Sequence, residues 1–219
     1  MNLFVNLFLI SKEISYPLSK LLNNLFEIGI FPDSWKIAHV TPIHKRVGSK
    51  NCKTSYRPIS ILPTLSKVCE SIMHERLLSH CIQHTLITER QAAYLKGDST
   101  ITQLIYLLHQ IRTSWGNSKI AHGLFLDISA AFDKVWHNGL LAKLEQIGIS
   151  GAFLTTLKSY LTNRKQCVVL DGIKSDLLEL HAGVPQGSRL GPLLFLWERI
   201  SVGTVPTVKM HPVVTVPTV

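Results

Sequence analysis

Apolar residues recur every three or four positions in five segments of this 219-residue chain, and glycines or prolines separate those segments from shorter extended ones. Such spacing places the apolar side chains of a segment on one face of a helix, and that face must be buried against another element. The chain is therefore expected to combine helices with short strands around a sizeable core. The expected helices span residues 14–28, 65–79, 100–108, 138–147 and 150–161.

Other segments have the composition of strands, rich in Ile, Val and Leu and bounded by turn residues. A further pair of segments is expected to form a β-hairpin, because Asp171-Gly172 between them is a preferred two-residue hairpin turn. Residues 123–127 read as a short buried strand that ends in a carboxylate. The expected extended segments are residues 36–44, 59–62, 123–127, 166–170 and 173–180.

Side chains near the helix starts predict how three helices begin. Thr100 and Gln103 fit a capping box, in which each side chain satisfies a backbone N–H of the other residue. Asn138 is expected to cap the next helix, and Ser150 to start the one after it. The apolar residues of the helix from Thr100 are expected to form its buried face. They are Ile101, Leu104, Ile105 and Leu108.

Composition places the chain among folded proteins without a membrane segment. Hydrophobic residues make up 46% of it, and no apolar stretch approaches the ~20 residues of a membrane span. Residues 1–10 have the apolar character of a signal peptide, but they lack its basic region and cleavage site, and Lys12-Glu13 follows. The four cysteines form no C-x-x-C pair, which predicts reduced thiols, no structural zinc and an intracellular protein, in nucleus or cytoplasm.

Positive charge is concentrated in the first half of the chain. Lys and Arg number 23 and Asp and Glu 14, for a net charge of +9. Residues 1–119 hold 14 basic and 7 acidic side chains, and between Ser34 and Cys69 there are seven bases and no acid. A stretch of this kind predicts either an anionic partner or a solvated loop face.

Three segments carry side chains suited to chemistry: residues 55–60, 126–137 and 183–195. A carboxylate that closes an apolar strand is costly to bury unpaired, so Asp127 is expected to serve a metal, a cap or an ion pair. Phe132 offers a flat face to a nucleotide sugar, with an ordinary core position as the alternative. Gln186 stands in a tight turn whose glycines let backbone approach a ligand.

Taken together and in this order, these segments resemble the reverse transcriptase domain of non-LTR retrotransposons of the LINE or jockey-like kind. Tyr56-Arg57-Pro58-Ile59-Ser60, continuing through Lys67 and Glu70, is similar to the fingers motif of that family. Leu126-Asp127 with Ala131-Phe132-Asp133 is similar to polymerase motif A, and Gly183-Val184-Pro185-Gln186-Gly187-Ser188 to motif B. The resemblance runs from about Ser15 to Phe195.

The resemblance implies an α+β fold, with the fingers and a partial palm of a right-hand polymerase and a sheet that is incomplete at the C-terminus. The domains implied are an N-terminal flank, a fingers region, a partial palm with motifs A and B, and a tail rich in Val, Thr and Pro. Their ranges are 1–14, 15–122, 123–196 and 197–219.

The resemblance also implies a metal site and its ion. Asp127 would be the catalytic carboxylate that binds the metal, and Ile128 would offer its backbone carbonyl to the same ion. The cofactor would be Mg²⁺ or Mn²⁺, as in the intact enzymes, which transfer nucleotides by two-metal chemistry.

The remaining site residues follow from the same resemblance. Arg57 and Lys45 would hold the triphosphate of a deoxynucleotide, Phe132 would be a steric gate under its sugar, and Gln186 and Gly187 would bind nucleotide and template. An RNA template and a DNA primer would be the nucleic-acid partners, whereas protein partners are unknown and no membrane is involved. The nucleic-acid contacts would be Lys36, Arg46, Lys50 and Lys53.

The chain departs from the family pattern in ways that bear on activity. Motif C of the family contains paired aspartates, but this sequence has no Asp-Asp and no Asp after Asp176. Arg189 and Gly191 also stand where the family favours other residues. The sequence therefore predicts a fragment of an RNA-directed DNA polymerase, without motif C and thumb, that is inactive alone. The alternatives are a catalytically dead nucleic-acid-binding remnant and a decayed product that misfolds.

Overall fold

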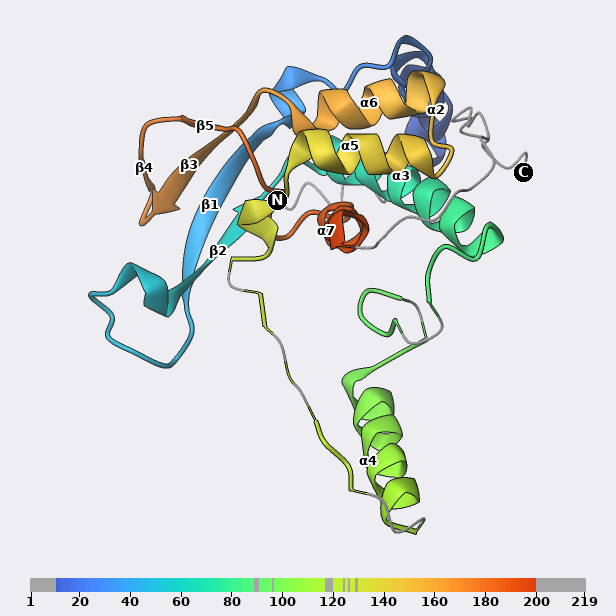
Figure 1. The fold of residues 1–219 in the computed structure, drawn as a ribbon. Coiled ribbons are helices and arrows are strands. Elements are labelled where there is room, and N and C mark those ends of the chain that lie inside the picture. Colours follow the sequence, from blue (N-terminus) through green and yellow to red (C-terminus); the bar gives the residue numbers. More distant parts are fainter. Residues whose placement is uncertain are drawn as a thin grey trace.

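A computed structural model describes residues 11–88, 91–95, 97–116, 120–123, 125, 127–128 and 130–199 (Figure 1). Most of the described helices lie together in one body, and a sheet extends from one side of it. These helices are α2 (Ser11–Ile28), α3 (Thr64–Gln83), α5 (His137–Gln146), α6 (Gly151–Leu161) and α7 (Gly191–Arg199). None of the described helices is both long and apolar enough to cross a membrane.

The core of the body lies between these helices. Helix α2 packs on α6, and α5 packs on both α6 and α7. Each of the five helices contributes apolar side chains that are almost fully buried, because its apolar residues recur at helical spacing and so share one face. Among them are Leu22, Phe26, Met73, Leu77, Leu140, Leu144, Phe153, Leu157, Leu194 and Trp197.

The sheet joins strands from the two halves of the chain. Its main path runs in the order β2-β1-β3-β4, and β5 also pairs with β3. β1 is antiparallel to β2, with Val40 opposite Ser60, and parallel to β3, with Val40 opposite Val168. The bounds are β1 (Ile37–His44), β2 (Tyr56–Ile61), β3 (Arg164–Leu170), β4 (Ile173–Lys174) and β5 (Leu178–Leu180). The combination of these helices with a mainly antiparallel sheet confirms the predicted α+β class.

The hairpin after β3 forms where the sequence predicts it. Asp171 and Gly172 make the turn, both with positive φ (51° and 81°), as a type I′ turn requires. β4 is short, but Ser175 continues the pairing, since its N–H donates to the Val168 carbonyl (3.0 Å) and its hydroxyl accepts from the Val168 N–H (2.9 Å). Pairing with β3 then resumes at β5.

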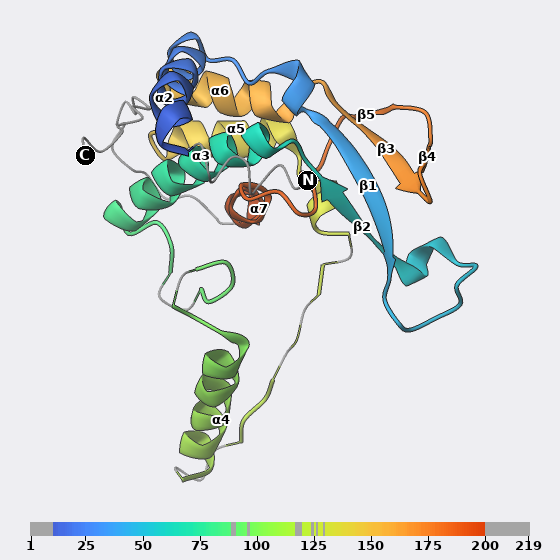
Figure 2. The same cartoon turned by 180° about the vertical axis from the view of Figure 1, so that it is seen from behind.

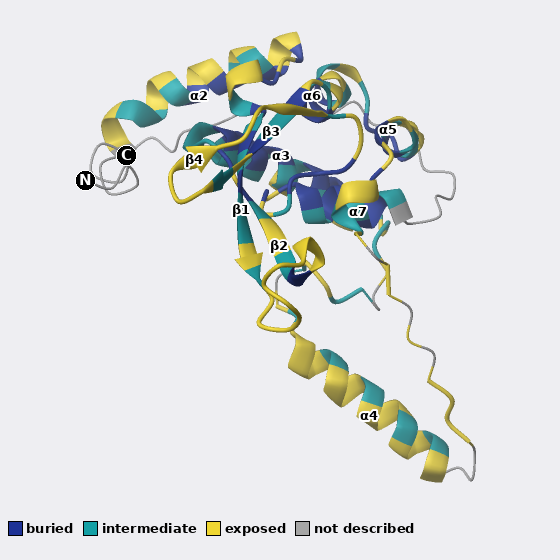
Figure 3. Ribbon diagram, turned by 90° about the vertical axis from the view of Figure 1, so that its left-hand side faces the viewer, coloured by how far each residue is buried: buried dark blue, intermediate teal, exposed yellow. Residues whose placement is uncertain are grey.

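The helix predicted from Thr100 is present as α4 (Thr100–Gly116), but its apolar face is not buried. Ile101, Leu104, Ile105 and Leu108 are 69%, 57%, 62% and 63% exposed, so the prediction of a buried face is wrong. Figures 2 and 3 show the reason, since α4 extends away from the body in both views, and most of it has the colour of exposed residues in Figure 3. No described residue of α4 is buried.

The strand predicted over residues 123–127 is not found. Gly123, Phe125 and Asp127 are exposed and irregular, with Phe125 82% exposed, whereas residues 124 and 126 lie outside the described part of the chain. A single extended segment leaves its backbone N–H and C=O groups unpaired unless a neighbouring strand accepts them. No described strand pairs with this segment, and that lack of a neighbour explains the difference.

Two helix starts differ from prediction, and helix α7 was not predicted. Ser99, not Thr100, caps α4, because the Thr102 N–H donates to the Ser99 hydroxyl (3.1 Å). Asn138 lies inside the first turn of α5, whose N-cap position is Trp136 and has no side-chain cap bond. Helix α7 runs to Arg199, so its last three residues fall in the segment assigned to the tail, and Trp197 is a core residue.

Candidate nucleotide and nucleic-acid site

The turn of residues 183–187 joins two other segments that are remote in the sequence. The Val184 N–H donates to the Phe132 carbonyl (2.8 Å), and the Gly183 N–H to the Val135 carbonyl (2.9 Å). On its other side the turn meets β2, where the Ser60 N–H donates to the Gln186 carbonyl (2.8 Å). Parts of all three segments that the sequence singled out are thus bonded together.

Glycines allow this close approach. Gly183 has a φ of +84°, and a Cβ there would lie 2.9 Å from the Cα and carbonyl oxygen of Asp133. Gly187 has a φ of +113°, and its Cβ would lie 3.0 Å from the carbonyl oxygen of Ser60. Both positions lie in the region of φ that favours glycine, with backbone where a side chain would begin. The turn therefore depends on these two glycines for its fit between β2 and residues 132–135.

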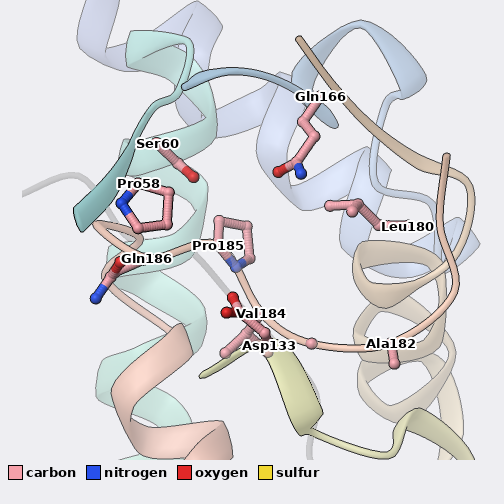
Figure 4. Close-up of a pocket in the computed structure, with 10 residues that line it drawn as sticks. Pro58, Ser60, Asp133, Gln166, Leu180, Ala182, Val184, Pro185 and Gln186 are labelled. Atoms are coloured by element: carbon pink, nitrogen blue, oxygen red, sulfur yellow. The ribbon is translucent and has the colours of Figure 1, made fainter. Parts of the chain in front are cut away.

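A cavity of about 220 Å³ lies between the turn and the sheet (Figure 4). Ser60 from β2 and Gln166 from β3 point toward the space above Pro185, whereas the Gln186 side chain points away from Gln166. The hydroxyl and the amide can each donate and accept hydrogen bonds. Asp133 also lines this cavity, at the end near the η3 turn (Phe132–Lys134).

A second hollow of about 390 Å³ lies on the same face of the sheet. It shares Pro58 with the first cavity and reaches Lys53 in the loop between β1 and β2. Its lining is mostly apolar, with one aromatic ring, and consists of Val40, Pro42, Lys53, Tyr56, Pro58, Val168 and Leu170. The two hollows together mark a path along the sheet from the turn to the basic loop.

The basic residues predicted to bind phosphate lie mainly on the hairpin formed by β1 and β2. Lys45, Arg46, Lys50 and Lys53 are exposed in its loop, and the Lys45 ammonium donates to the Thr54 carbonyl (2.9 Å). Arg57 is exposed on β2 between Tyr56 and Pro58. Because successive side chains of a strand alternate between its faces, Arg57 projects from the face opposite the two hollows.

Lys36 does not belong to this exposed set. Its side chain is 4% exposed, and its ammonium forms an ion pair with the Asp33 carboxylate at 2.8 Å. This hydrogen bond and the charge of Lys36 hold the pKa of Asp33 below its usual value. Lys36 is therefore buried and ion-paired, unlike the exposed lysines of the hairpin loop, and its contact with nucleic acid stays a prediction.

Phe132 is half-buried beside the turn. Its ring lies 5.5 Å from that of Phe195 and 6.4 Å from that of Tyr94, measured between centroids. The Phe132 ring is packed on one side and partly exposed on the other, so it is intermediate between a core residue and a free surface residue. The position leaves part of the ring accessible beside residues 183–184, to which its backbone is bonded.

Asp127 and Ile128 lie in the exposed irregular segment before the η3 turn. Among the residues that the structure describes, no three or more His, Cys, Asp or Glu side chains lie close enough to hold a metal ion. One exposed carboxylate and one backbone carbonyl do not supply the ligands of a two-metal centre. The residues present here thus do not fit a complete catalytic metal site.

The burial of two ionisable residues, Glu70 and Arg164, was not predicted. Glu70 on α3 and Arg164 at the start of β3 are 0% and 1% exposed. Burial raises the pKa of the Glu70 carboxyl, while its hydrogen bonds and the Arg164 guanidinium act in the opposite direction. A signal was present in the sequence, since Glu70 lies at helical spacing from Ser66, Met73 and Leu77, which are buried.

Known proteins share this arrangement of motifs. Residues 43–197 match the family model described as reverse transcriptase (RNA-dependent DNA polymerase). The chain belongs to the reverse transcriptase family, whose members in general depend on divalent metal ions. Within that family it is similar to polymerases of jockey-like non-LTR retrotransposons. The resemblance drawn from the sequence motifs is confirmed.

Three relatives from Drosophila melanogaster illustrate this similarity. The chain is 38% identical over 173 residues, or 79% of its length, to a probable RNA-directed DNA polymerase from transposon X-element. It is 38% identical over 178 residues to the RNA-directed DNA polymerase from mobile element jockey, and 34% identical over 178 residues to that from transposon BS. These matches cover 19%, 19% and 20% of the relatives, so the chain spans about a fifth of their length.

Proposed function

We propose that this chain forms the nucleotide- and template-binding part of a retrotransposon RNA-directed DNA polymerase. The observation that carries the proposal is the bonding of the Pro185-Gln186-Gly187 turn to both β2 and the Phe132 backbone. In this proposal, Phe132 as sugar contact, the turn with the Gln186 amide and the basic hairpin would surround one binding region. An RNA template, a DNA primer and deoxynucleoside triphosphates are the proposed partners.

The proposal assigns different ligands to the two faces of the sheet. Template would follow the hollows from the turn to Lys53, where Tyr56 offers an aromatic ring for a base and the lysines face its phosphates. Arg57 on the opposite face, with Lys45, would bind a triphosphate through charge-assisted hydrogen bonds. Gln186 and Gly187 lie along β2, the edge strand of the sheet, and would contact both nucleotide and template there.

In the intact polymerase, a primer 3′-hydroxyl would attack the α-phosphate of the bound nucleotide, with pyrophosphate as the leaving group. Mg²⁺ or Mn²⁺ is the proposed ion, and Asp127 with the Ile128 carbonyl would contribute part of its site. Phe132 would exclude a ribose 2′-hydroxyl by contact with the sugar. These assignments rest on the match of residues 126–133 to motif A.

The salt dependence of hybrid binding tests the basic hairpin. Each phosphate contact contributes roughly 0.7–0.9 log units of affinity per log unit of salt. Changing Arg46, Lys50 and Lys53 to Gln should therefore lower the slope for an RNA–DNA hybrid by about two to three. A matched control makes the same change at three exposed lysines on helices α2 and α6, which keeps the net charge equal. These are Lys12, Lys20 and Lys158.

Equal slopes for the two triple variants would contradict the assignment, because the hairpin would then contribute only general charge. Fluorescence anisotropy with a labelled hybrid at several salt concentrations gives both slopes. Competition with an unlabelled DNA duplex shows whether the chain binds the RNA–DNA hybrid more tightly than duplex DNA.

A nucleic-acid-binding remnant without catalysis is a second candidate function. It is favoured by the exposed position of Asp127 and by the lack of an Asp-Asp pair in the sequence. Both candidates bind a hybrid, and only the first supports primer extension once the remaining polymerase segments are supplied.

An intracellular location is also part of the proposal. Cys52, Cys69, Cys81 and Cys167 are free thiols, in keeping with a reducing compartment. Fractionation of cells that express the tagged chain would locate it, and recovery from the secreted fraction would contradict this assignment.

A further inference from the structure

The carboxylate of Glu70 connects α3 to the segment that follows the Pro185-Gln186-Gly187 turn. One carboxylate oxygen accepts from the Arg189 N–H at 2.9 Å and from the Leu190 N–H at 3.4 Å. The other oxygen accepts from the Ser66 hydroxyl at 2.9 Å. The two connected segments are more than 100 residues apart in the chain, so these bonds are tertiary contacts.

The turn is held at two points by one continuous piece of chain. At its first point the Ser60 N–H of β2 donates to the Gln186 carbonyl, and at its second Glu70 accepts from residues 189–190. β2 ends at Ile61 and α3 begins at Thr64, so both contacts come from neighbouring elements. Gln186 is itself the first point and Gly187 lies between the two, so neither residue can shift far without breaking a contact.

Burial raises the pKa of the Glu70 carboxyl, and a nearby buried arginine offsets only part of this effect. Arg164 is buried nearby, donates from Nη1 to the Tyr160 carbonyl (2.9 Å) and stacks 4.7 Å from the centre of the Tyr160 ring. Its guanidinium lowers the pKa of Glu70 and so opposes the effect of burial. A buried acid that accepts from three donors is satisfied as an acceptor, which favours a fixed geometry over a mobile one.

We propose that Glu70 is a positioning residue for the turn that carries Gln186 and Gly187, and that this geometry sets the affinity for the nucleic acid at the turn. The second part rests on the proposed function, whereas the first part concerns the turn itself. Glu70 touches no ligand in this assignment and acts through the backbone of residues 189–190.

Two substitutions at Glu70 separate hydrogen bonding from packing. Glu70→Gln keeps an acceptor oxygen for residues 189–190, and its amide group can donate to the Ser66 hydroxyl. Glu70→Leu keeps the approximate size but has no acceptor. Met73→Ala on the same helix is the control, because it weakens the packing of α3 and leaves the bonds to the turn in place.

Hydrogen exchange of the backbone amides is the first measurement. Glu70→Leu should speed exchange at Arg189 and Leu190 by about 10- to 100-fold relative to the core of α6, because both N–H groups lose their hydrogen-bond acceptor. Glu70→Gln should stay close to the wild type, and Met73→Ala should change exchange without singling out residues 189–190. Unchanged exchange in Glu70→Leu, or equal exchange in the Leu and Gln variants, would overturn the positioning role.

Affinity for an RNA–DNA hybrid is the second measurement, on the same four proteins. It should fall in Glu70→Leu and be retained in Glu70→Gln, parallel to the exchange at residues 189–190. If exchange responds as expected and the affinity does not, positioning of the turn stands and its role in nucleic-acid binding is overturned. If the wild type binds no hybrid, the proposed function fails, and the exchange result is still decisive for Glu70.

Discussion

Gly183 shows how a single residue can decide whether the candidate site forms. It lies where the turn crosses residues 132–133, with its N–H bonded to the Val135 carbonyl and its carbonyl bonded to the His137 ring (2.7 Å). Gly183→Ala would add a Cβ 2.9 Å from backbone atoms of those residues, at a φ that alanine rarely adopts. We expect this substitution to lower the free energy of unfolding by about 2–4 kcal/mol in urea denaturation.

Gly172→Ala is the matched control for this prediction. Gly172 has nearly the same φ, +81°, but a Cβ there would meet nothing within 4 Å. Its substitution therefore isolates the backbone conformation, which costs about 1 kcal/mol. Equal losses at the two positions would show that the close approach of the turn does not contribute to stability.

His80 makes the stability of the body depend on pH. It is 3% exposed, and its Nε2 bonds to the Ile147 carbonyl at 2.8 Å, where α5 ends. Burial lowers the pKa of His80 and the charge of His84 lowers it further, while the bond to Ile147 partly offsets both. The folded protein then binds fewer protons than the unfolded chain below about pH 6.5, so stability is lost as the pH falls from there.

The measurement is urea denaturation of wild type and His80→Gln at pH 7.5 and pH 5.5. The Gln amide can still donate to the Ile147 carbonyl but does not titrate, so we expect a smaller loss of stability at the lower pH in the variant. His74, whose pKa burial also lowers, contributes to both proteins equally. The same pH dependence in both would rule out His80 as its source.

At the scale of elements, the exposed face of α4 yields a direct comparison of two leucines. Leu108 on α4 is 63% exposed and Leu144 on α5 is 0% exposed, although both belong to helices with apolar residues at helical spacing. Leu144→Ala should lower the free energy of unfolding by about 2–5 kcal/mol, because it leaves a cavity. Leu108→Ala should change it by less than about 0.5 kcal/mol. A loss at Leu108 near that at Leu144 would mean that α4 is covered.

Local chemistry explains which elements the sequence could predict. The Asp171-Gly172 turn and the end of α2 at Ile28, just before Gly29, depend on residues a few positions apart, and both were found where expected. The burial of α4 and the strand before Asp127 depend instead on a partner from elsewhere in the chain. Periodicity identifies an apolar face, but it does not say whether another element lies against that face.

At the scale of the whole molecule, the site was predicted through motif order rather than through side-chain contacts. The turn of residues 183–187 could be placed near Phe132 by family resemblance, and the backbone bonds between them confirm this proximity. Lys36 and Glu70 show what that approach leaves out. Each is a charged residue whose environment, Asp33 in one case and the N–H groups of residues 189–190 in the other, is set by folding.

The whole chain also bears on catalysis, and we expect that it extends no primer. Transfer of a nucleotide requires carboxylates held in place before the transition state, and loss of one such stabilising group typically reduces the rate by about 10²–10³. Asp127 is exposed, and no cluster of acidic or metal-binding side chains surrounds it in the described residues. Purified chain on a primed RNA template with Mg²⁺ or Mn²⁺ should therefore match its Asp127→Asn variant. Extension that this substitution abolishes would show instead that a second chain completes the site, or that Glu198 does, the acidic residue on α7 after motif B.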